Sequence, residues 1–213
     1  MTSPLVTVLL VDDHAVVREG YRRLLERDAK IQVVGEAANS MQAYERALAL
    51  DPEVVVMDIA LPGVSGIEAM RRILARRPQQ CVLMFSMHDD AIFPSRALEA
   101  GARGYVSKTS APEVLIDAIS AVARGERYLS PDVRQVMSQQ ASSHAKSIVA
   151  TLTAREFEVL RLLAHGDTVK HIGEKLGLSE KTVANHQSAI RDKLGARNGV
   201  QLAKVAAELG LSL

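Results

Sequence analysis

The chain has 213 residues, of which 47% are hydrophobic and 24% are charged, and its formal net charge is +1. This balance is that of an ordinary globular protein and argues against wholesale disorder or a fibrous repeat. At about 100–200 residues per domain, the length favours two compact domains over one. No segment approaches the roughly 18 consecutive apolar residues of a membrane span, and the start of the chain has no basic segment typical of a signal peptide.

The rarer residue types narrow the class of protein further. Cys81 is the single cysteine, so the chain cannot form an intramolecular disulfide, and this favours a reducing cytoplasm. The six histidines are dispersed and give no spacing typical of a zinc site. Aromatic residues make up 3% of the chain, which argues against a surface that stacks the bases of single strands or RNA. We expect a cytoplasmic protein without membrane contacts.

The first 124 residues alternate between apolar runs and segments with helical periodicity. Runs rich in β-branched residues predict strands at Val6–Val11, Ile31–Gly35, Val54–Met57, Val82–Phe85 and Gly104–Val106. Between them, apolar residues recur at helical spacing; the stretch 90–100 is the weakest of these because Pro94 interrupts it. The alternation predicts an α/β fold in which five parallel strands are joined by crossover helices that cover both faces.

The composition changes after residue 124. Ser130, Pro131 and Asp132 form a typical helix start, and they predict a helix that ends near Met137. Residues 138–147 are rich in Gln, Ser and Ala and lack an apolar face. We therefore divide the chain into a first domain (1–124), a partly helical linker (125–147) and a second domain (148–213).

The second domain reads as helices without a strand. Helical segments are predicted at 153–164, 168–176, about 180–194 and about 199–208, which makes a small all-α domain of four helices. Gly177 lies between the second and third of these, and Ser179 is a good N-cap for the third. Two helices joined by a short glycine-containing turn are typical of a helix-turn-helix. The domain carries nine Lys or Arg and seven Asp or Glu, which is weak support for nucleic-acid binding.

Chemically active side chains follow four of the predicted strands. Asp12 and Asp13 follow the first strand, Asp58 the third, Ser86 the fourth and Lys108 the fifth. The carboxyl ends of parallel strands meet at one edge of the sheet, so these side chains should converge there. Three carboxylates repel one another unless a cation neutralises them, and an all-oxygen site suits Mg²⁺. With a lysine and a hydroxyl beside the metal, the cluster predicts phosphoryl transfer onto a carboxylate.

The segments around these residues resemble the receiver domain of two-component response regulators. The resemblance rests on Leu10–His14, Met57–Gly66, Ser86 and Gly101–Lys108, and it covers residues 5–124. It implies a flavodoxin-like sheet with strand order 2-1-3-4-5 and a phosphoryl group transferred to Asp58 by a partner histidine kinase. It also implies that the chain is no enzyme beyond catalysing its own phosphorylation and dephosphorylation.

The same resemblance assigns roles to individual residues. Mg²⁺ would be held by Asp12, Asp13, Asp58 and the backbone carbonyl of Ala60. Ser86 would hydrogen-bond the acyl phosphate and Lys108 would pair with it. Tyr105 matches the aromatic residue that turns inward when the domain is phosphorylated.

The helix expected at about 180–194 carries a polar strip opposite its buried residue Val183. The strip and its flanks comprise Lys181, Thr182, Ala184, Asn185 and Ser188, at the N-terminal half where a recognition helix meets base edges in the major groove. Further basic side chains could anchor DNA phosphates: Lys170, His171, Arg191, Lys193 and Arg197.

The segments Leu152–Leu160, Ser179–His186 and Lys193–Leu194 resemble the LuxR-type helix-turn-helix. Together with the receiver, they identify the chain as a member of the NarL/FixJ family of response regulators. The family implies a homodimer, formed on phosphorylation, that binds an inverted repeat in double-stranded DNA. It also implies dimer contacts in the last helix, with Val200, Leu202, Ala203 and Val205 as candidates; packing within the domain explains these residues equally well.

The combined reading is a transcription factor switched by phosphorylation of Asp58. Two alternatives remain open at this point. A Mg²⁺-dependent phosphatase could use Asp58 as its nucleophile, although Ala60 stands where such enzymes usually carry a second acid. An adaptor could use the first domain as an unphosphorylated protein-binding module, although the complete set of acidic residues, Ser86 and Lys108 argues against it.

Overall fold

The computed structural model describes residues 5–62, 64–87, 91–139, 152–199, 201, 202 and 205. It consists of two compact units, Met1–Ala141 and Ser142–Leu213. The division between them falls inside the segment 125–147 that the sequence predicts to be a linker. No helix in the described part of the chain is long and apolar enough to span a membrane.

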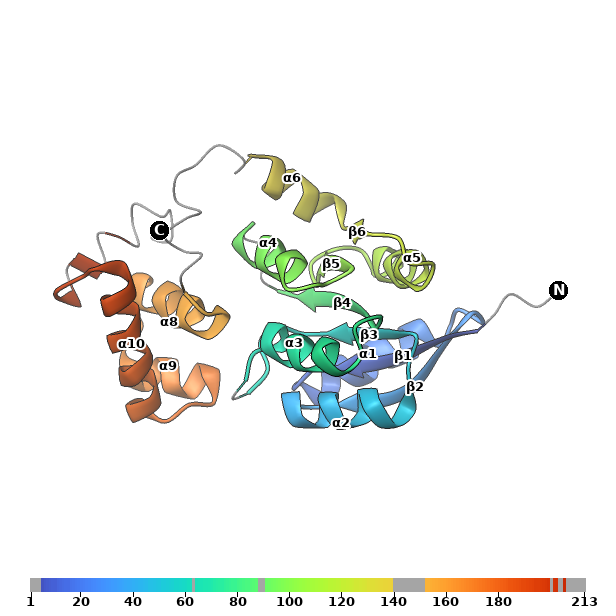
Figure 1. Ribbon diagram of the computed structural model, residues 1–213, viewed down its shortest axis with the longest axis horizontal. Coiled ribbons are helices and arrows are strands. Elements are labelled where there is room, and N and C mark those ends of the chain that lie inside the picture. Colours follow the sequence, from blue (N-terminus) through green and yellow to red (C-terminus); the bar gives the residue numbers. More distant parts are fainter. Residues whose placement is uncertain are drawn as a thin grey trace. The chain divides into compact units, whose positions relative to one another are not determined.

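A six-stranded sheet forms the centre of the first unit (Figure 1). The strands are β1 (Val6–Val11), β2 (Ile31–Ala37), β3 (Val54–Met57), β4 (Cys81–Ser86), β5 (Gly104–Ser107) and β6 (Tyr128–Leu129). Neighbouring strands pair in parallel, in the order β2-β1-β3-β4-β5-β6. The α/β fold and the order of the first five strands are therefore as predicted.

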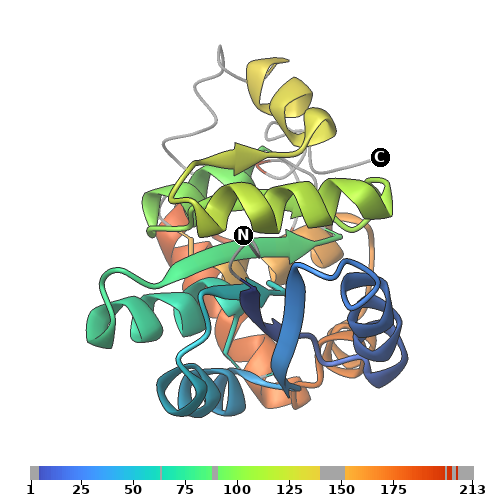
Figure 2. The same ribbon diagram turned by 90° about the vertical axis from the view of Figure 1, so that its right-hand side faces the viewer.

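Helices connect successive strands, one more follows the last strand, and together they cover both faces of the sheet. They are α1 (Ala15–Leu25), α2 (Ser40–Leu50), α3 (Gly66–Arg76), α4 (Ile92–Glu99), α5 (Pro112–Ala123) and α6 (Pro131–Gln139). Successive residues of a strand point to opposite faces, so Val8 and Leu10 of β1 share one face, where they pack with Leu25 of α1 and Ile119 of α5. Figure 2 shows α1 and α5 on this side of the sheet and α2 and α3 on the other.

The number of strands is the main correction to the predicted fold. Tyr128 and Leu129, assigned to the linker from the sequence, form β6 and pair with Gly104 and Tyr105 of β5. A two-residue strand shows no alternation of polar and apolar residues, so its sequence carries no strand signal. The predicted helix after Ser130 is present as α6. Residues 128–139 thus belong to the first unit.

The position of Pro94 explains why this segment is helical although the sequence pattern is interrupted there. Helix α4 begins at Ile92, so Pro94 lies in the first turn, where the backbone N–H groups have no acceptor within the helix. Proline costs little there. Residues 88–90, at the expected start of this segment, lie outside the described residues.

The described part of the second unit contains three helices, α8 (Ala154–Ala164), α9 (Val169–Leu176) and α10 (Glu180–Leu194). Each begins at a side-chain cap: Thr153, Thr168 and Ser179 accept hydrogen bonds from backbone N–H groups of the following turn. Gly177 ends α9 with a φ of 62°, a conformation that favours glycine. The three-residue connection from α9 to α10 gives the predicted helix-turn-helix. Most of the fourth predicted helix lies outside the described residues.

Candidate phosphoacceptor site and DNA-binding helix

The acidic residues and the lysine meet at one edge of the sheet, as predicted. Asp12 follows β1 and is 2% exposed, and Asp58 follows β3 and is 3% exposed. The Lys108 ammonium, just beyond β5, donates to both: Nζ lies 2.6 Å from Asp12 Oδ2 and 2.5 Å from Asp58 Oδ2. Lys108 thus contacts two carboxylates that lie 50 and 96 residues away in the sequence, because the carboxyl ends of three parallel strands meet at one edge of the sheet.

The charges around Lys108 keep it protonated. Burial of the ammonium opposes its charge, but the nearby carboxylates of Asp58 and Asp12 outweigh burial and raise the pKa of Lys108 above its usual value. The ring of Phe85 lies below the ammonium, with its centroid 5.8 Å from Nζ, and Tyr21 packs edge-on against that ring. Lys108 is therefore a fixed positive charge at ordinary pH.

Arg18 holds the backbone beside Asp12. Its Nη1 donates to the Asp12 carbonyl at 2.6 Å, and its Nε donates to Glu36 at 2.8 Å. The Asp12 carboxylate accepts from the backbone N–H of His14 at 2.8 Å. Arg18 was missed from the sequence, because a lysine or arginine in the first turns of an exposed helix carries no signal of its own. Together these contacts fix the orientation of Asp12 toward the sheet edge.

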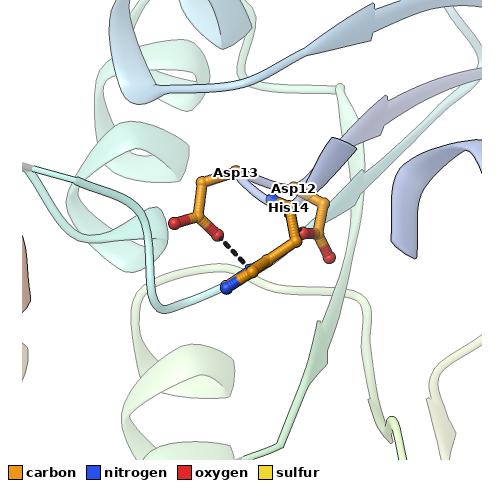
Figure 3. A group of neighbouring side chains, drawn as sticks. All are labelled: Asp12, Asp13 and His14. Atoms are coloured by element: carbon orange, nitrogen blue, oxygen red, sulfur yellow. Dashed lines mark hydrogen bonds and ion pairs between the residues drawn. The ribbon is translucent and has the colours of Figure 1, made fainter. Parts of the chain in front are cut away.

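Figure 3 shows Asp12 and Asp13 with His14, whose ring reaches toward the Asp13 carboxylate. The distance from His14 Nδ1 to Asp13 Oδ1 is 2.8 Å, and potential ligand atoms of the three residues lie within 4.8 Å of one another. Asp12, Asp13 and Asp58 bring three negative charges and Lys108 one positive charge, so a divalent cation would balance the cluster. The oxygen donors suit Mg²⁺. The residues present fit a magnesium ion.

The loop after Asp58 is held close to the start of α3. The backbone N–H of Ala60 donates to Asp58 Oδ1 at 3.2 Å, and the N–H of Gly66 donates to the Ile59 carbonyl at 2.9 Å. A Cβ atom on Gly66 would lie 1.8 Å from the Asp58 carbonyl oxygen. The glycine therefore permits the close approach that places Asp58 at the sheet edge, a role that the sequence motif alone did not reveal.

Ser86 and Tyr105 lie on the neighbouring strands β4 and β5. Ser86 ends β4 and is fully buried, and its carbonyl accepts from the Lys108 N–H at 2.8 Å. The Tyr105 side chain is also fully buried, on β5 opposite Met84. The resemblance implies that this aromatic residue turns inward on phosphorylation; here it already occupies the interior.

The polar strip of the second unit lies on α10 as predicted. Val183 and Ile190 are buried against the other helices, whereas Lys181, Asn185 and Ser188 are exposed. Ala184 is exposed as well, and Thr182 is half-buried with its hydroxyl 2.8 Å from that of Ser179. The N-terminal half of α10 thus presents short polar side chains to solvent, which suits contact with base edges.

The basic residues predicted to bind DNA phosphates differ in their solvent exposure and in their contacts within the unit. Lys170, His171 and Arg197 are exposed and Arg191 is half-buried. Lys193 is engaged within the unit: its Nζ lies 2.6 Å and 2.8 Å from the two carboxylate oxygens of Glu156, which ties α10 to α8. Burial of Glu156 opposes its ionisation, but hydrogen bonds from Lys193 and Thr153 outweigh it and lower the pKa of the carboxyl. Lys193 thus has a structural partner that spacing alone could not reveal.

The candidate dimer residues are only partly covered by the structure. Leu202 is 3% exposed, so it packs in the core of its own unit and offers little surface to a partner. Val205 is half-buried. Val200 and Ala203 lie outside the described residues.

Comparison with protein families matches both units. Residues 8–120 match the family described as "Response regulator receiver domain", and residues 150–206 match "Bacterial regulatory proteins, luxR family". Among curated proteins, the response regulator UvrY of Escherichia coli K12 is 37% identical over 209 residues, covering 97% of this chain and 96% of that protein. The response regulator GacA of Pseudomonas aeruginosa is 36% identical over 210 residues, covering 97% and 98%.

Solved structures agree in fold. A LuxR-family two-component response regulator from Aurantimonas is 46% identical and covers 64% of this chain and 97% of its own, with a TM-score of 0.63. RcsB from Salmonella enterica serovar Typhimurium, bound to the promoter rprA in the presence of phosphomimetic BeF₃⁻, is 28% identical. It covers 95% of this chain and 98% of its own, with a TM-score of 0.64.

Proposed function

The chain belongs to the response regulators that join a receiver domain to a LuxR-type DNA-binding domain, and from this premise we propose that phosphorylation of Asp58 controls its binding to DNA. The phosphoryl donor we propose is a sensor histidine kinase. Asp12, Asp13, Asp58 and the backbone carbonyl of Ala60 would hold Mg²⁺. The family is one of transcription regulators, and the chemistry proposed is limited to the chain's own phosphorylation and dephosphorylation.

The observation that carries this proposal is the position of the Lys108 ammonium between Asp12 and Asp58. An Asp58 carboxylate oxygen attacks the phosphorus of a phosphohistidine, the phosphorus–nitrogen bond breaks, and its electron pair returns to the imidazole of the kinase. Negative charge grows on the transferred phosphoryl oxygens during this step. Lys108 is within reach of the acceptor carboxylate and is charged, so it can stabilise those oxygens. A bound Mg²⁺ would supply further charge neutralisation.

Phosphorylation changes the partners of Lys108. The unmodified Asp58 carboxylate shares the ammonium with Asp12; a phosphoryl group carries more charge and more acceptor oxygens and draws the ammonium toward itself. The Ser86 hydroxyl, at the end of the neighbouring strand, would hydrogen-bond the same group. We propose that these local changes bias the first unit between two states and promote pairing of two chains.

Chelation of the metal provides the first test. We expect a small-molecule phosphodonor such as acetyl phosphate to label the full chain with one phosphoryl group in the presence of Mg²⁺, and excess EDTA to abolish the labelling. Intact-mass spectrometry measures the added mass. Repeated release of phosphate from a phosphate ester, without a stable labelled chain, would favour the phosphatase. Absence of labelling at saturating Mg²⁺ would favour the adaptor.

We propose that two copies of α10 enter successive major grooves of an inverted repeat in double-stranded DNA. Exposure of Lys181, Asn185 and Ser188 supports this assignment, because Asn can bind adenine with two hydrogen bonds and Lys suits guanine or phosphate. One relative, RcsB, has been solved as two dimers bound to two parallel DNAs. The compartment we propose is the cytoplasm, where a single Cys81 thiol stays reduced.

The salt dependence of DNA binding separates contacts to DNA from contacts within the unit. Lys181→Ala should reduce the slope of log affinity against log salt by about 1, the change expected for one lost phosphate contact. Lys193→Ala should leave the slope unchanged and lower stability by about 1 kcal/mol, because it removes the ion pair with Glu156 that ties α10 to α8. Fluorescence anisotropy over a salt series and urea unfolding measure the two effects. A reduced slope for Lys193→Ala would show that Lys193 leaves Glu156 to contact DNA.

A further inference from the structure

The loop that carries Lys108 is hydrogen-bonded to helix α6, in a part of the chain that the proposed function does not use. Ser110 Oγ donates to Asp132 Oδ1 at 2.9 Å, and Asp132 lies in the first turn of α6. Ser110 is two residues beyond Lys108, whose ammonium bridges the two carboxylates. The Ser110–Asp132 hydrogen bond therefore joins the phosphoacceptor side of β5 to the last described element before the second unit.

The start of α6 is fixed to β5 as well. The Ser130 N–H donates to the Tyr105 carbonyl at 3.0 Å, and the Ser107 N–H approaches Ser130 Oγ at 3.4 Å. Ser130 is fully buried. Asp132 is thus held at a defined place beside the strand that leads into Lys108.

The loop between Lys108 and Ser110 is a tight turn. The Ser110 N–H donates to the Ser107 carbonyl at 3.1 Å, and the hydroxyls of Ser107 and Thr109 lie 2.7 Å apart. A turn closed in this way moves as a unit. A displacement of Lys108 toward a phosphoryl group is thereby passed to Ser110, and a restraint on Ser110 is passed to Lys108.

Asp132 is ionised in this position. Burial opposes the charge, but hydrogen bonds from Ser130 and Ser110 outweigh it and lower the pKa of the carboxyl. Its second oxygen, Oδ2, is shielded from solvent and has no hydrogen-bond partner within the described residues. The backbone N–H groups of Asp132 and Val133 also lower the pKa of this carboxyl, so the acid stabilises the start of α6 as well as accepting from Ser110.

We infer that Asp132 is a positioning residue for the phosphorylation reaction: through Ser110 it holds the turn that places the Lys108 ammonium against Asp58. This inference rests on the proposed function and adds a regulatory connection to it. Because coupling between two sites is reciprocal, a contact that steadies Lys108 also makes the docking of α6 depend on the state of Asp58. Helix α6 is therefore coupled to the phosphoacceptor through the Ser110–Asp132 hydrogen bond and the turn that carries Lys108.

The test removes this hydrogen bond from each side in the full chain. Ser110→Ala and Asp132→Ala should each slow labelling by acetyl phosphate and Mg²⁺ by about threefold to tenfold, the factor expected for one lost hydrogen bond. The double variant should be no slower than the slower single variant, because both changes remove the same contact. Asp132→Asn keeps an acceptor oxygen and should label at the wild-type rate. Gln135→Ala, at an exposed position of α6, is the matched control.

Phos-tag electrophoresis gives the rates, and urea unfolding in parallel reports any loss of stability. Rates for Ser110→Ala and Asp132→Ala equal to that of Gln135→Ala, in a wild-type chain that labels normally, would overturn the inference while leaving the proposed function intact. A slow Asp132→Asn variant would overturn it as well, because the acceptor is retained. A wild-type chain that takes up no phosphoryl group would contradict the proposed function itself, and the inference would fall with it.

Discussion

Replacing Asp58 with Ala removes the response of DNA binding to phosphodonor. Wild-type chain treated with acetyl phosphate and Mg²⁺ should bind DNA about 5- to 150-fold more tightly than untreated chain, the usual range for coupling between two sites. The variant lacks the acceptor oxygen, so both preparations should bind with the affinity of the untreated wild type. The DNA is a fragment enriched from random sequences by the phosphorylated wild-type chain, and gel shift measures the affinity.

The stability of this variant separates loss of the acceptor from loss of the fold. Asp58 is buried among carboxylates that share a single lysine, so its removal relieves repulsion and leaves Lys108 paired with Asp12. We expect the variant to be at least as stable as the wild type in urea. Asp117→Asn, at an exposed position of α5, serves as the control carboxylate and should respond to the phosphodonor normally. Equal DNA binding by Asp58→Ala and by phosphodonor-treated wild type would exclude the switch.

Replacing Gly66 with Ala should destabilise the first unit by about 3 kcal/mol or more, a large effect for one methyl group. The new Cβ would lie 1.8 Å from the Asp58 carbonyl oxygen and 3.1 Å from Ile59 Cα. Both contacts are to backbone, which cannot rotate away as a long side chain can. The start of α3 or the loop after Asp58 has to move, and labelling of Asp58 should weaken together with stability. Urea unfolding followed by circular dichroism measures the loss.

Gly20→Ala provides the matched control for this substitution. Gly20 lies inside α1, and a Cβ atom there would meet nothing within 4 Å. Because alanine is the better helix former, this variant should gain about 0.5–1 kcal/mol. Wild-type stability of Gly66→Ala would mean that the loop after Asp58 yields to the new methyl group without cost.

Much of the site could be read from strand ends alone. The position of Asp12, Asp58 and Lys108 directly after three parallel strands predicts that they share an edge, and the Lys108 ammonium joins the two carboxylates there. The prediction needs no distances, because topology fixes where the strands end. The strand ends did not predict the roles of Arg18 and Gly66. These roles depend on one hydrogen bond and one close backbone approach, which no local sequence pattern encodes.

The second unit shows the same division. Helical spacing identified Val183 and Ile190 as buried and Lys181 and Asn185 as exposed, because a helix fixes the direction of each side chain. Spacing also placed Lys193 among the basic residues able to reach DNA. Its pairing with Glu156 depends on the packing of α10 against α8, which spacing within one helix does not determine.

By itself the sequence determined the periodic features of this protein: the α/β alternation, the strand ends that carry the acidic residues and lysine, and the polar strip of α10. Each follows from the fixed geometry of a helix or strand. The tertiary structure decided what depends on contacts between distant segments: the short strand β6, the burial of Tyr105 and the Ser110–Asp132 hydrogen bond. Such contacts form only when whole helices and strands pack together, so no local sequence pattern predicts them.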